Sequence, residues 1–122
     1  MPNINAALGC AQLENLDRYV ADKRETAARY AEFFKGKEDI TFFTEPADCK
    51  SNYWLNAVVL KDKAAQLDFL EYTNDHGVMT RPVWELMNRL PMFEHCETDG
   101  LENTEWLADR VVNIPSSVRL DK

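Results

Sequence analysis

The first sixteen residues, MPNINAALGCAQLENL, most constrain what this chain can fold into. They predict the start of a helix, yet apolar or small side chains stand on every side of its first turns: Ile4, Ala6, Ala7, Leu8, Cys10, Ala11, Leu13 and Leu16. A helix that is apolar all round is normally buried all round. A chain of 122 residues has difficulty covering its own first helix so completely. We therefore expect Ile4, Leu8 and Ala11 to pack against a surface that this chain does not supply.

Helical spacing of apolar residues continues well beyond this opening and predicts one long helix over residues 3–35. Asn3 suits the N-cap, and Gly36 suits the position just after the last turn. Gly9 lies inside the helix, where glycine costs about 1 kcal/mol. We interpret Gly9 as a place where another backbone approaches closely.

Seven shorter segments are expected after this helix. In chain order they are a strand at 40–44, a strand at 53–60, a helix at 64–75, a short strand that begins at 78–79 and stops before Pro82, a loop with a short helix at 81–93, a helix at 103–110 and an extended or turn exit at 113–117. The run at 53–60 is apolar almost throughout, which is typical of a central strand. The helical residues expected to face the core are Leu67, Leu70, Phe69 or Tyr72, Trp106 and Leu107.

This order of elements predicts a single domain over residues 1–122 with an α/β fold of the α+β two-layer type. A long N-terminal helix leads into a small mixed or antiparallel sheet, which helices cover on one face. The chain shows no internal repeats and no low-complexity tracts.

Four motifs, in this order and spacing, resemble one enzyme family. They are MPNINAALGCAQLENLD, SNYWLNAVVL, HGVMTRPVWELMNRLPMF and WLADRVVNIPSSV. Together they resemble the C-terminal small domain of the DegT/DnrJ/EryC1/StrS nucleotide-sugar aminotransferases, which are fold-type I enzymes dependent on pyridoxal phosphate (PLP). The last three motifs look most like the branch that acts on UDP-linked acetamido sugars, such as those leading to bacillosamine or legionaminic acid.

The resemblance implies an intact enzyme that transfers an amino group to a UDP-linked 4-keto sugar in cell-surface glycan biosynthesis. In the family, the lysine that binds PLP lies in a large N-terminal domain, which would precede Met1. A Schiff-base lysine is usually desolvated, and every lysine of this chain has a charged or terminal setting. We therefore expect no catalytic residue and no cofactor in this chain, and no activity from it alone.

Arg81 and Trp84 are the candidate substrate-binding residues. The proline after Arg81 favours extended backbone there, and a guanidinium can bind two oxygens of a phosphate. Trp84 could stack on a uracil or sugar ring. The alternatives are a surface ion pair for Arg81 and core packing for Trp84. Trp54 stands where many family members carry a histidine, and for it core packing is the better interpretation.

Composition excludes several classes of protein. A net charge of −7 argues against nucleic-acid binding, and no apolar run approaches the ~20 residues of a membrane span. Three cysteines, an odd number, indicate reduced thiols and a cytoplasmic location. The spacing of His and Cys does not suit a metal site, and Glu94, His95 and Glu97 are expected in a solvated loop.

Two functional hypotheses remain open beside a purely structural role. The chain is a small domain detached from a UDP-sugar aminotransferase, or it is a freestanding module that binds a nucleotide sugar or docks on a partner chain. Both hypotheses lead us to expect homo-oligomers that form through the N-terminal helix.

Overall fold

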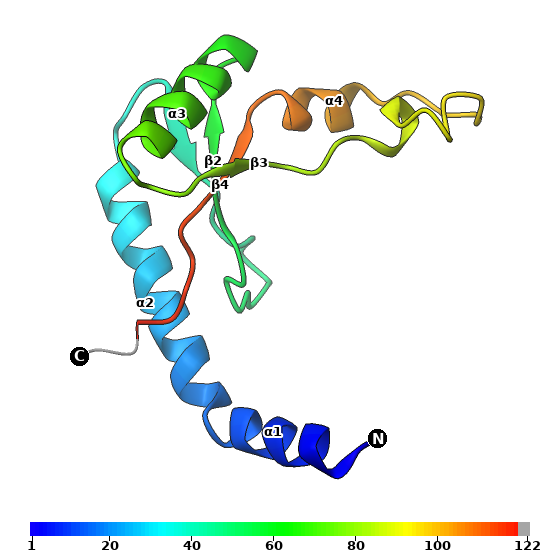
Figure 1. Cartoon of the computed structure of the whole chain (residues 1–122). Coiled ribbons are helices and arrows are strands. Elements are labelled where there is room, and N and C mark those ends of the chain that lie inside the picture. Colours follow the sequence, from blue (N-terminus) through cyan, green and yellow to red (C-terminus); the bar gives the residue numbers. More distant parts are fainter. Residues whose placement is uncertain (120–122) are drawn as a thin grey trace.

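A computed structural model describes residues 1–119 and places a small sheet at the junction of the helices (Figure 1). Its elements are α1 (Asn3–Glu14), α2 (Leu16–Phe34), β1 (Ile40–Phe42), β2 (Asn56–Leu60), α3 (Lys63–Asp75), β3 (Arg81–Pro82), the 3-10 helix η1 (Met87–Arg89), α4 (Glu102–Ala108) and β4 (Val111–Ile114). The expected α/β class is confirmed, and the sheet is entirely antiparallel.

The strands lie in the order β1-β2-β4-β3, so β2 is central as its apolar run predicted. The register pairs Phe42 with Val58 and Val58 with Val112. Cross-strand partners share a face of the sheet, and these three side chains are buried. The opposite face carries exposed or half-buried residues such as Thr41 and Val59. The sheet therefore has one core face.

Helices α2 and α3 cover that core face. Ala27 of α2 is buried in the same cluster as the strand residues, and Phe34 of α2 packs against them. Phe69 and Leu70 of α3 pack on the cluster from the other helix. The result is the expected two-layer arrangement, with α3 crossing from β2 to the edge strand β3 (Figure 1).

The single helix predicted over residues 3–35 is in fact two helices with a break at Asn15. The backbone of Asn15 has φ −103° and ψ −1°, and its side-chain amide donates to the carbonyl of Ala11 at 2.9 Å. This side-chain bond competes with the regular backbone ladder. Pro2, not Asn3, is the N-cap residue of α1, and no side chain caps that end. The end at Gly36 is confirmed, with a φ of +73° that favours glycine.

Two extended segments in the second half of the chain differ from expectation. The strand expected to begin at 78–79 and stop before Pro82 is instead Arg81–Pro82. The extended or turn exit expected at 113–117 overlaps the end of a strand, β4, Val111–Ile114. Pro82 is tolerated because β3 is an edge strand, which leaves one side of its backbone unpaired. The strand expected from residue 53 begins at Asn56, because Tyr53 has a φ of +47°.

Two predicted inward faces are also corrected. On α3 the fully buried residue is Gln66, whereas Leu67 is 54% exposed. The Gln66 amide donates to the carbonyls of Ala108 at 2.9 Å and Val111 at 2.8 Å, so it satisfies the backbone where α4 meets β4. Tyr72 on α3 is exposed, as are Trp106 and Leu107 on α4, which covers no core face.

Two parts of the chain project from the sheet without being covered by it. One is α1, which contains no buried residue. The other is the arm, residues 83–101, which runs out from β3 and returns to α4 (Figure 1). Along the arm Trp84, Met87 and Met92 are exposed. The fold therefore has a small covered core and two bare apolar projections.

Candidate functional site

A cavity of about 800 Å³ brings the two predicted substrate-binding residues together. Its walls come from α2, the loop before β2, β3 with its flanks, and the end of β4. The lining residues are Lys23, Trp54, Leu55, Met79, Arg81, Pro82, Val83, Trp84, Asn113, Ile114, Pro115, Ser116 and Ser117. Arg81 and Trp84 thus share one wall, as their spacing allows, and Trp54 joins them from a distant segment.

The backbone around Arg81 is held in place, while its side chain has no acidic partner among residues 1–119. The residue before it, Thr80, is buried, and its hydroxyl shares a hydrogen bond of 2.6 Å with that of Thr73 on α3. The amide of Asn74 donates to the Thr80 carbonyl at 3.2 Å. The guanidinium of Arg81 contacts the sulfur of Met79 at 3.6 Å and forms no ion pair within residues 1–119. The surface ion pair considered for Arg81 is therefore not formed with any residue in the range 1–119.

The two cavity tryptophans are exposed, so core packing is wrong for both. Trp84 is 77% exposed and Trp54 is 66% exposed. Trp84 stands at the start of the arm, and it is neither a core residue nor one of the hydrophobic residues packed against the core. Trp54 follows the turn made by Tyr53, and its backbone N–H donates to the side chain of Asn52 at 3.0 Å. Both rings offer flat apolar area to whatever enters the cavity.

Lys23 is a cavity residue that the sequence reasoning missed. It comes from α2, and its ammonium donates to the carbonyl of Ser116 at 2.6 Å and of Trp54 at 3.3 Å. A signal was present, because Lys23 stands one helical turn before Ala27, which is buried against the sheet. A cation on that side of α2 has to lie near the sheet.

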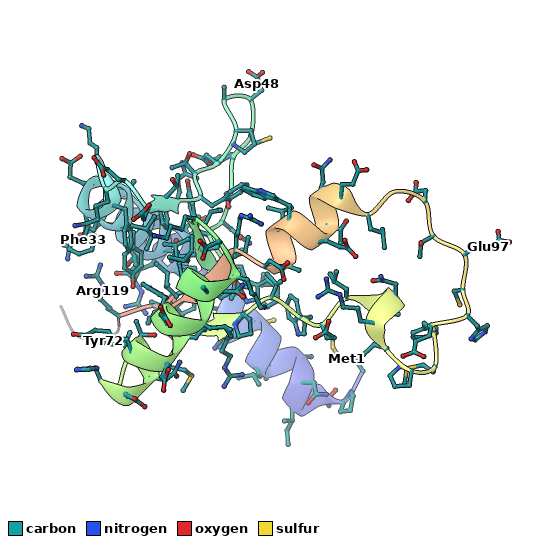
Figure 2. The ribbon with its side chains drawn as sticks, turned by 90° about the horizontal axis from the view of Figure 1, so that it is seen from above. Met1, Phe33, Asp48, Tyr72, Glu97 and Arg119 are labelled. Carbon is teal, nitrogen blue, oxygen red and sulfur yellow. The ribbon has the colours of Figure 1, made fainter. Side chains whose placement is uncertain are left out.

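A second group of polar residues holds the loop that ends at Trp54. The guanidinium of Arg24 bonds both carboxylate oxygens of Glu45, at 2.6 and 3.0 Å. It also donates to the carbonyl of Ser51 at 2.6 Å, and the Ser51 N–H donates to Glu45 at 2.6 Å. The Arg24 hydrogen bond, helped by that of Ser51, lowers the pKa of Glu45 to about 2. This clamp fixes residues 45–51, whose tip carries Asp48 in Figure 2.

A further cavity of about 680 Å³ lies between α2 and the segment after β4. Phe33 and Arg119 are among its lining residues. Arg119 pairs with Asp22 at 3.5 Å, so its charge is already matched. Arg29, the second cation of this cavity, pairs with Glu25. Both cations of this apolar groove are therefore matched, and the cavity around Arg81 is the better candidate for binding an anion.

We tested whether the described lysines could hold PLP. A Schiff-base lysine is usually desolvated, which favours its neutral form. The ammonium of Lys23 is instead fixed by two carbonyls. Lys35, Lys61 and Lys63 pair with carboxylates at 3.4–3.7 Å. Lys37 lies over the Phe33 ring, and Lys50 is exposed to solvent. These settings do not fit a Schiff base.

The remaining candidates are placed as follows. Glu94, His95 and Glu97 lie exposed on the arm, with Glu97 near its tip in Figure 2. Within residues 1–119, no group of three His, Cys, Asp or Glu side chains is arranged to hold a metal ion. No helix in that range is long and apolar enough to cross a membrane.

The proposed interface residues of α1 are all uncovered by this chain. Ile4, Leu8 and Ala11 are exposed. Apart from Gly9, its two neighbours and the adjacent backbone of α1, no described atom lies within 4 Å of the position that a Cβ at Gly9 would take. Any close backbone approach at Gly9 would therefore come from another chain or from a segment outside residues 1–119.

Comparisons with known proteins agree with this architecture. The chain is 30% identical over 120 residues to the putative pyridoxal phosphate-dependent aminotransferase EpsN of Bacillus subtilis, covering 95% of this chain and 31% of that protein. It is 28% identical over 118 residues to GDP-perosamine synthase of Escherichia coli O157:H7, covering 95% of this chain and 31% of the enzyme. The chain therefore spans about a third of the length of these relatives.

Solved structures show the same fold. The chain superimposes on Helicobacter pylori PseC, an aminotransferase involved in pseudaminic acid biosynthesis, with a TM-score of 0.86 at 20% identity, covering 97% of this chain and 33% of PseC. It superimposes on the sugar aminotransferase CalS13 of Micromonospora echinospora with a TM-score of 0.82 at 25% identity, covering 95% of this chain and 30% of CalS13. The pattern of the DegT/DnrJ/EryC1/StrS aminotransferase family matches residues 1–122. The chain therefore belongs to the DegT/DnrJ/EryC1/StrS aminotransferase family.

Proposed function

We propose that this chain forms one wall of the nucleotide-sugar cleft of an aminotransferase. The substrate would be a UDP-linked 4-keto sugar of the bacillosamine or legionaminic acid type, used in cell-surface glycan biosynthesis. The observation that carries the proposal is the cavity that unites Arg81, which has no acidic partner within residues 1–119, with the exposed ring of Trp84. Relatives named GDP-perosamine synthase and sugar aminotransferase support a nucleotide-linked sugar as the substrate, and the UDP-linked type is our proposal.

Each of the two residues has a role that follows from its chemistry. The planar guanidinium of Arg81 would bind phosphate oxygens through two parallel N–H bonds, which a point charge cannot do. The exposed face of Trp84 would stack on the uracil or sugar ring. Thr80, bonded to α3, would keep Arg81 in place while the ligand binds.

The chemistry of amino transfer would lie outside this chain. PLP, when bound, carries the amino group and stabilises negative charge on the reacting carbon. Because the described lysines do not fit a Schiff base, we propose that a large domain outside this chain supplies that lysine and the cofactor site. On this proposal residues 1–122 form a single small domain, and the isolated chain is inactive. Its exposed free cysteines support a reducing, cytoplasmic location.

Calorimetric titration of the chain with UDP and with a UDP-N-acetyl sugar tests the binding role. We expect Arg81→Ala to weaken binding by roughly tenfold or more, the loss of a charge-assisted hydrogen bond. Arg18→Ala is the matched control, because Arg18 lies over Tyr19 and does not line the cavity. Absence of binding by the wild-type chain, or an equal loss in both variants, would contradict the proposal.

A second candidate is a freestanding module that self-associates or docks on a partner chain. It is favoured by the uncovered apolar surface of α1, where Ile4 and Leu8 are exposed. Large uncovered apolar patches mark interaction surfaces. A chain that associates through α1 but does not bind UDP sugars would support this candidate over the first.

A further inference from the structure

We propose that Tyr53 is a positioning residue, whose left-handed backbone directs the Trp54 ring away from the core face of the sheet and into the 800 Å³ cavity. Tyr53 has a φ of +47° and is the only residue other than glycine with a positive φ among residues 1–119. This conformation is unfavourable for a residue that carries a Cβ. Such strain persists only where neighbouring contacts hold it, and it is concentrated at functional sites.

The alternation of side chains along β2 shows what this turn changes. Side chains alternate between the two faces of a strand, and Asn56, Val58 and Leu60 are the buried ones of β2. Regular continuation towards the N-terminus would place Trp54 on that same core face and Tyr53 on the other. The structure has the reverse burial, because Tyr53 packs against the core cluster, whereas Trp54 is 66% exposed and lines the cavity. The left-handed residue thus exchanges the surroundings of the two rings.

Tyr53 is held in this conformation from both ends. Its hydroxyl accepts from the backbone N–H of Glu45 at 3.1 Å, and its own N–H donates to the Ser51 hydroxyl at 2.9 Å. The guanidinium of Arg24 lies over the ring, 5.7 Å from its centroid. The same guanidinium bonds both carboxylate oxygens of Glu45 and the carbonyl of Ser51. One cation of α2 therefore fixes both residues to which Tyr53 is bonded.

The backbone of Trp54 is also fixed on both sides. Its N–H donates to the side chain of Asn52 at 3.0 Å, and its carbonyl accepts from Lys23 at 3.3 Å. Because these bonds hold the backbone, the direction of the Trp54 ring depends on the φ of Tyr53. Contact between this ring and a nucleotide sugar rests on the proposed function, whereas the placement of the ring does not.

Two substitutions separate the backbone conformation of Tyr53 from its ring. Tyr53→Asn and Tyr53→Val both remove the ring and the hydroxyl, but asparagine tolerates a left-handed backbone and a β-branched residue does not. The indole N–H resonance of Trp54 in the full chain, assigned with Trp54→Phe, reports the surroundings of its ring. We expect this resonance to move clearly further from its wild-type position in Tyr53→Val than in Tyr53→Asn, although Tm falls in both. Equal movement in the two variants, or none in either, would overturn the proposal.

Arg24 provides an independent test, which also covers the case in which neither Tyr53 variant folds. Arg24→Met keeps the aliphatic stem but removes the guanidinium from its partners, so the Trp54 indole resonance should move. Arg18→Met is the matched control, because Arg18 lies on the same helix over another tyrosine ring, that of Tyr19, at 5.3 Å. It should leave the resonance in place. No movement in a folded Arg24→Met chain, or equal movement in the control, would contradict the proposal.

The wild-type chain supplies the remaining measurements. A strong nuclear Overhauser effect between the amide and α protons of Tyr53 should mark its positive φ, and a weak one would overturn the proposal. Calorimetric titration with a UDP-N-acetyl sugar separates this proposal from the proposed function. If the wild-type chain binds the sugar, Tyr53→Val should bind it roughly threefold or more weakly than Tyr53→Asn. Equal affinity of the two variants would overturn Tyr53 as a positioning residue for that ligand. If the wild-type chain does not bind, the proposed function fails, and the indole resonances still decide the role of Tyr53.

Discussion

Adjacent cations on α2 have entirely different surroundings. Arg24 is bonded to Glu45 and to the carbonyl of Ser51. Lys23 ends between the carbonyls of Trp54 and Ser116. Successive helical residues point about 100° apart, which directs Arg24 to the loop and Lys23 to the cavity. One turn of helix thus both fixes the loop and contributes to the candidate site.

The Arg24–Glu45 clamp predicts a specific pH dependence of stability. The pKa of Glu45 falls from 4.5 to about 2 in the folded chain, so the unfolded chain binds its proton first. The clamp therefore stabilises the fold above about pH 4.5, and this contribution is lost as the pH falls towards 2. Glu45→Gln should lower Tm at neutral pH, and the difference from wild type should shrink on acidification.

Thermal unfolding of both chains between neutral pH and pH 2 measures this effect. Glu32→Gln is the control, because Glu32 forms an exposed pair with Lys35 at 3.7 Å, and exposed pairs contribute little. A Tm difference for Glu45→Gln that stays constant with pH would show that the carboxylate charge is not what stabilises the loop.

Asn56 allows a second prediction at this scale. It is 1% exposed on β2, and neither polar atom of its side chain has a hydrogen-bond partner within residues 1–119. Replacing a buried, unpaired polar group with an apolar one of similar size is near neutral or stabilising. Asn56→Leu should therefore raise the free energy of unfolding or change it by less than ~1 kcal/mol.

Denaturant unfolding compares Asn56→Leu with Leu60→Ala on the same strand. Leu60 is buried, and its truncation should cost about 2–5 kcal/mol. If Asn56→Leu costs as much as Leu60→Ala, the amide has a hydrogen-bond partner, such as a buried water, that its replacement removes.

At the scale of elements, the sequence predicted those that local patterns determine. The helix expected at 64–75 is Lys63–Asp75, because an Asp62 N-cap and Gly77 mark its ends. The two-residue strand β3 was misplaced, because pairing with β4 determines it and Pro82 suggested a stop. The break at Asn15 was missed, since helical spacing continues across it and a single side-chain bond to Ala11 accompanies it.

Two glycines at different places in the helices allow a paired prediction. Gly36 has a φ of +73°, and Gly9 lies within α1; a Cβ added at either would meet no described atom beyond the local backbone and chain neighbours. Gly36→Ala should cost roughly 1–2 kcal/mol through backbone conformation alone. Gly9→Ala should increase helix content, since alanine favours a helix interior by ~1 kcal/mol.

Circular dichroism and denaturant unfolding of the two variants measure these opposite signs. A Gly36→Ala variant as stable as wild type would mean that the turn after α2 adopts another conformation. A loss of helix content in Gly9→Ala would mean that α1 needs a close contact at Gly9 to form.

At the scale of the whole molecule, α1 and the arm both extend away from the sheet and are not covered by it (Figure 1).

Only part of the candidate site could be predicted from the sequence. Arg81 and Trp84 are close in sequence, and their pattern identified them. Lys23, Trp54 and Ser116 come from segments far apart in the chain, and only the folded sheet brings them to one cavity. The exposure of Trp54 and Trp84 could not be predicted either, because it depends on which surfaces the folded chain covers.

The uncovered surface of α1 leads to a prediction about assembly. Leu8 is 61% exposed, and burying a leucine side chain contributes about 1.5–3 kcal/mol. If copies of the chain associate through α1, Leu8→Glu should weaken association by roughly tenfold or more. Sedimentation over a range of concentrations should show oligomers for wild type and a shift towards monomer for Leu8→Glu. Because α1 has no buried residue, the variant should keep the Tm of the wild-type monomer.

Leu67→Glu on α3 is the matched control, because Leu67 is an exposed leucine away from α1 and its substitution should leave the oligomer intact. A wild-type chain that stays monomeric at all concentrations, or an equal effect of both substitutions, would show that α1 does not join copies of this chain and that its apolar surface is for a different partner.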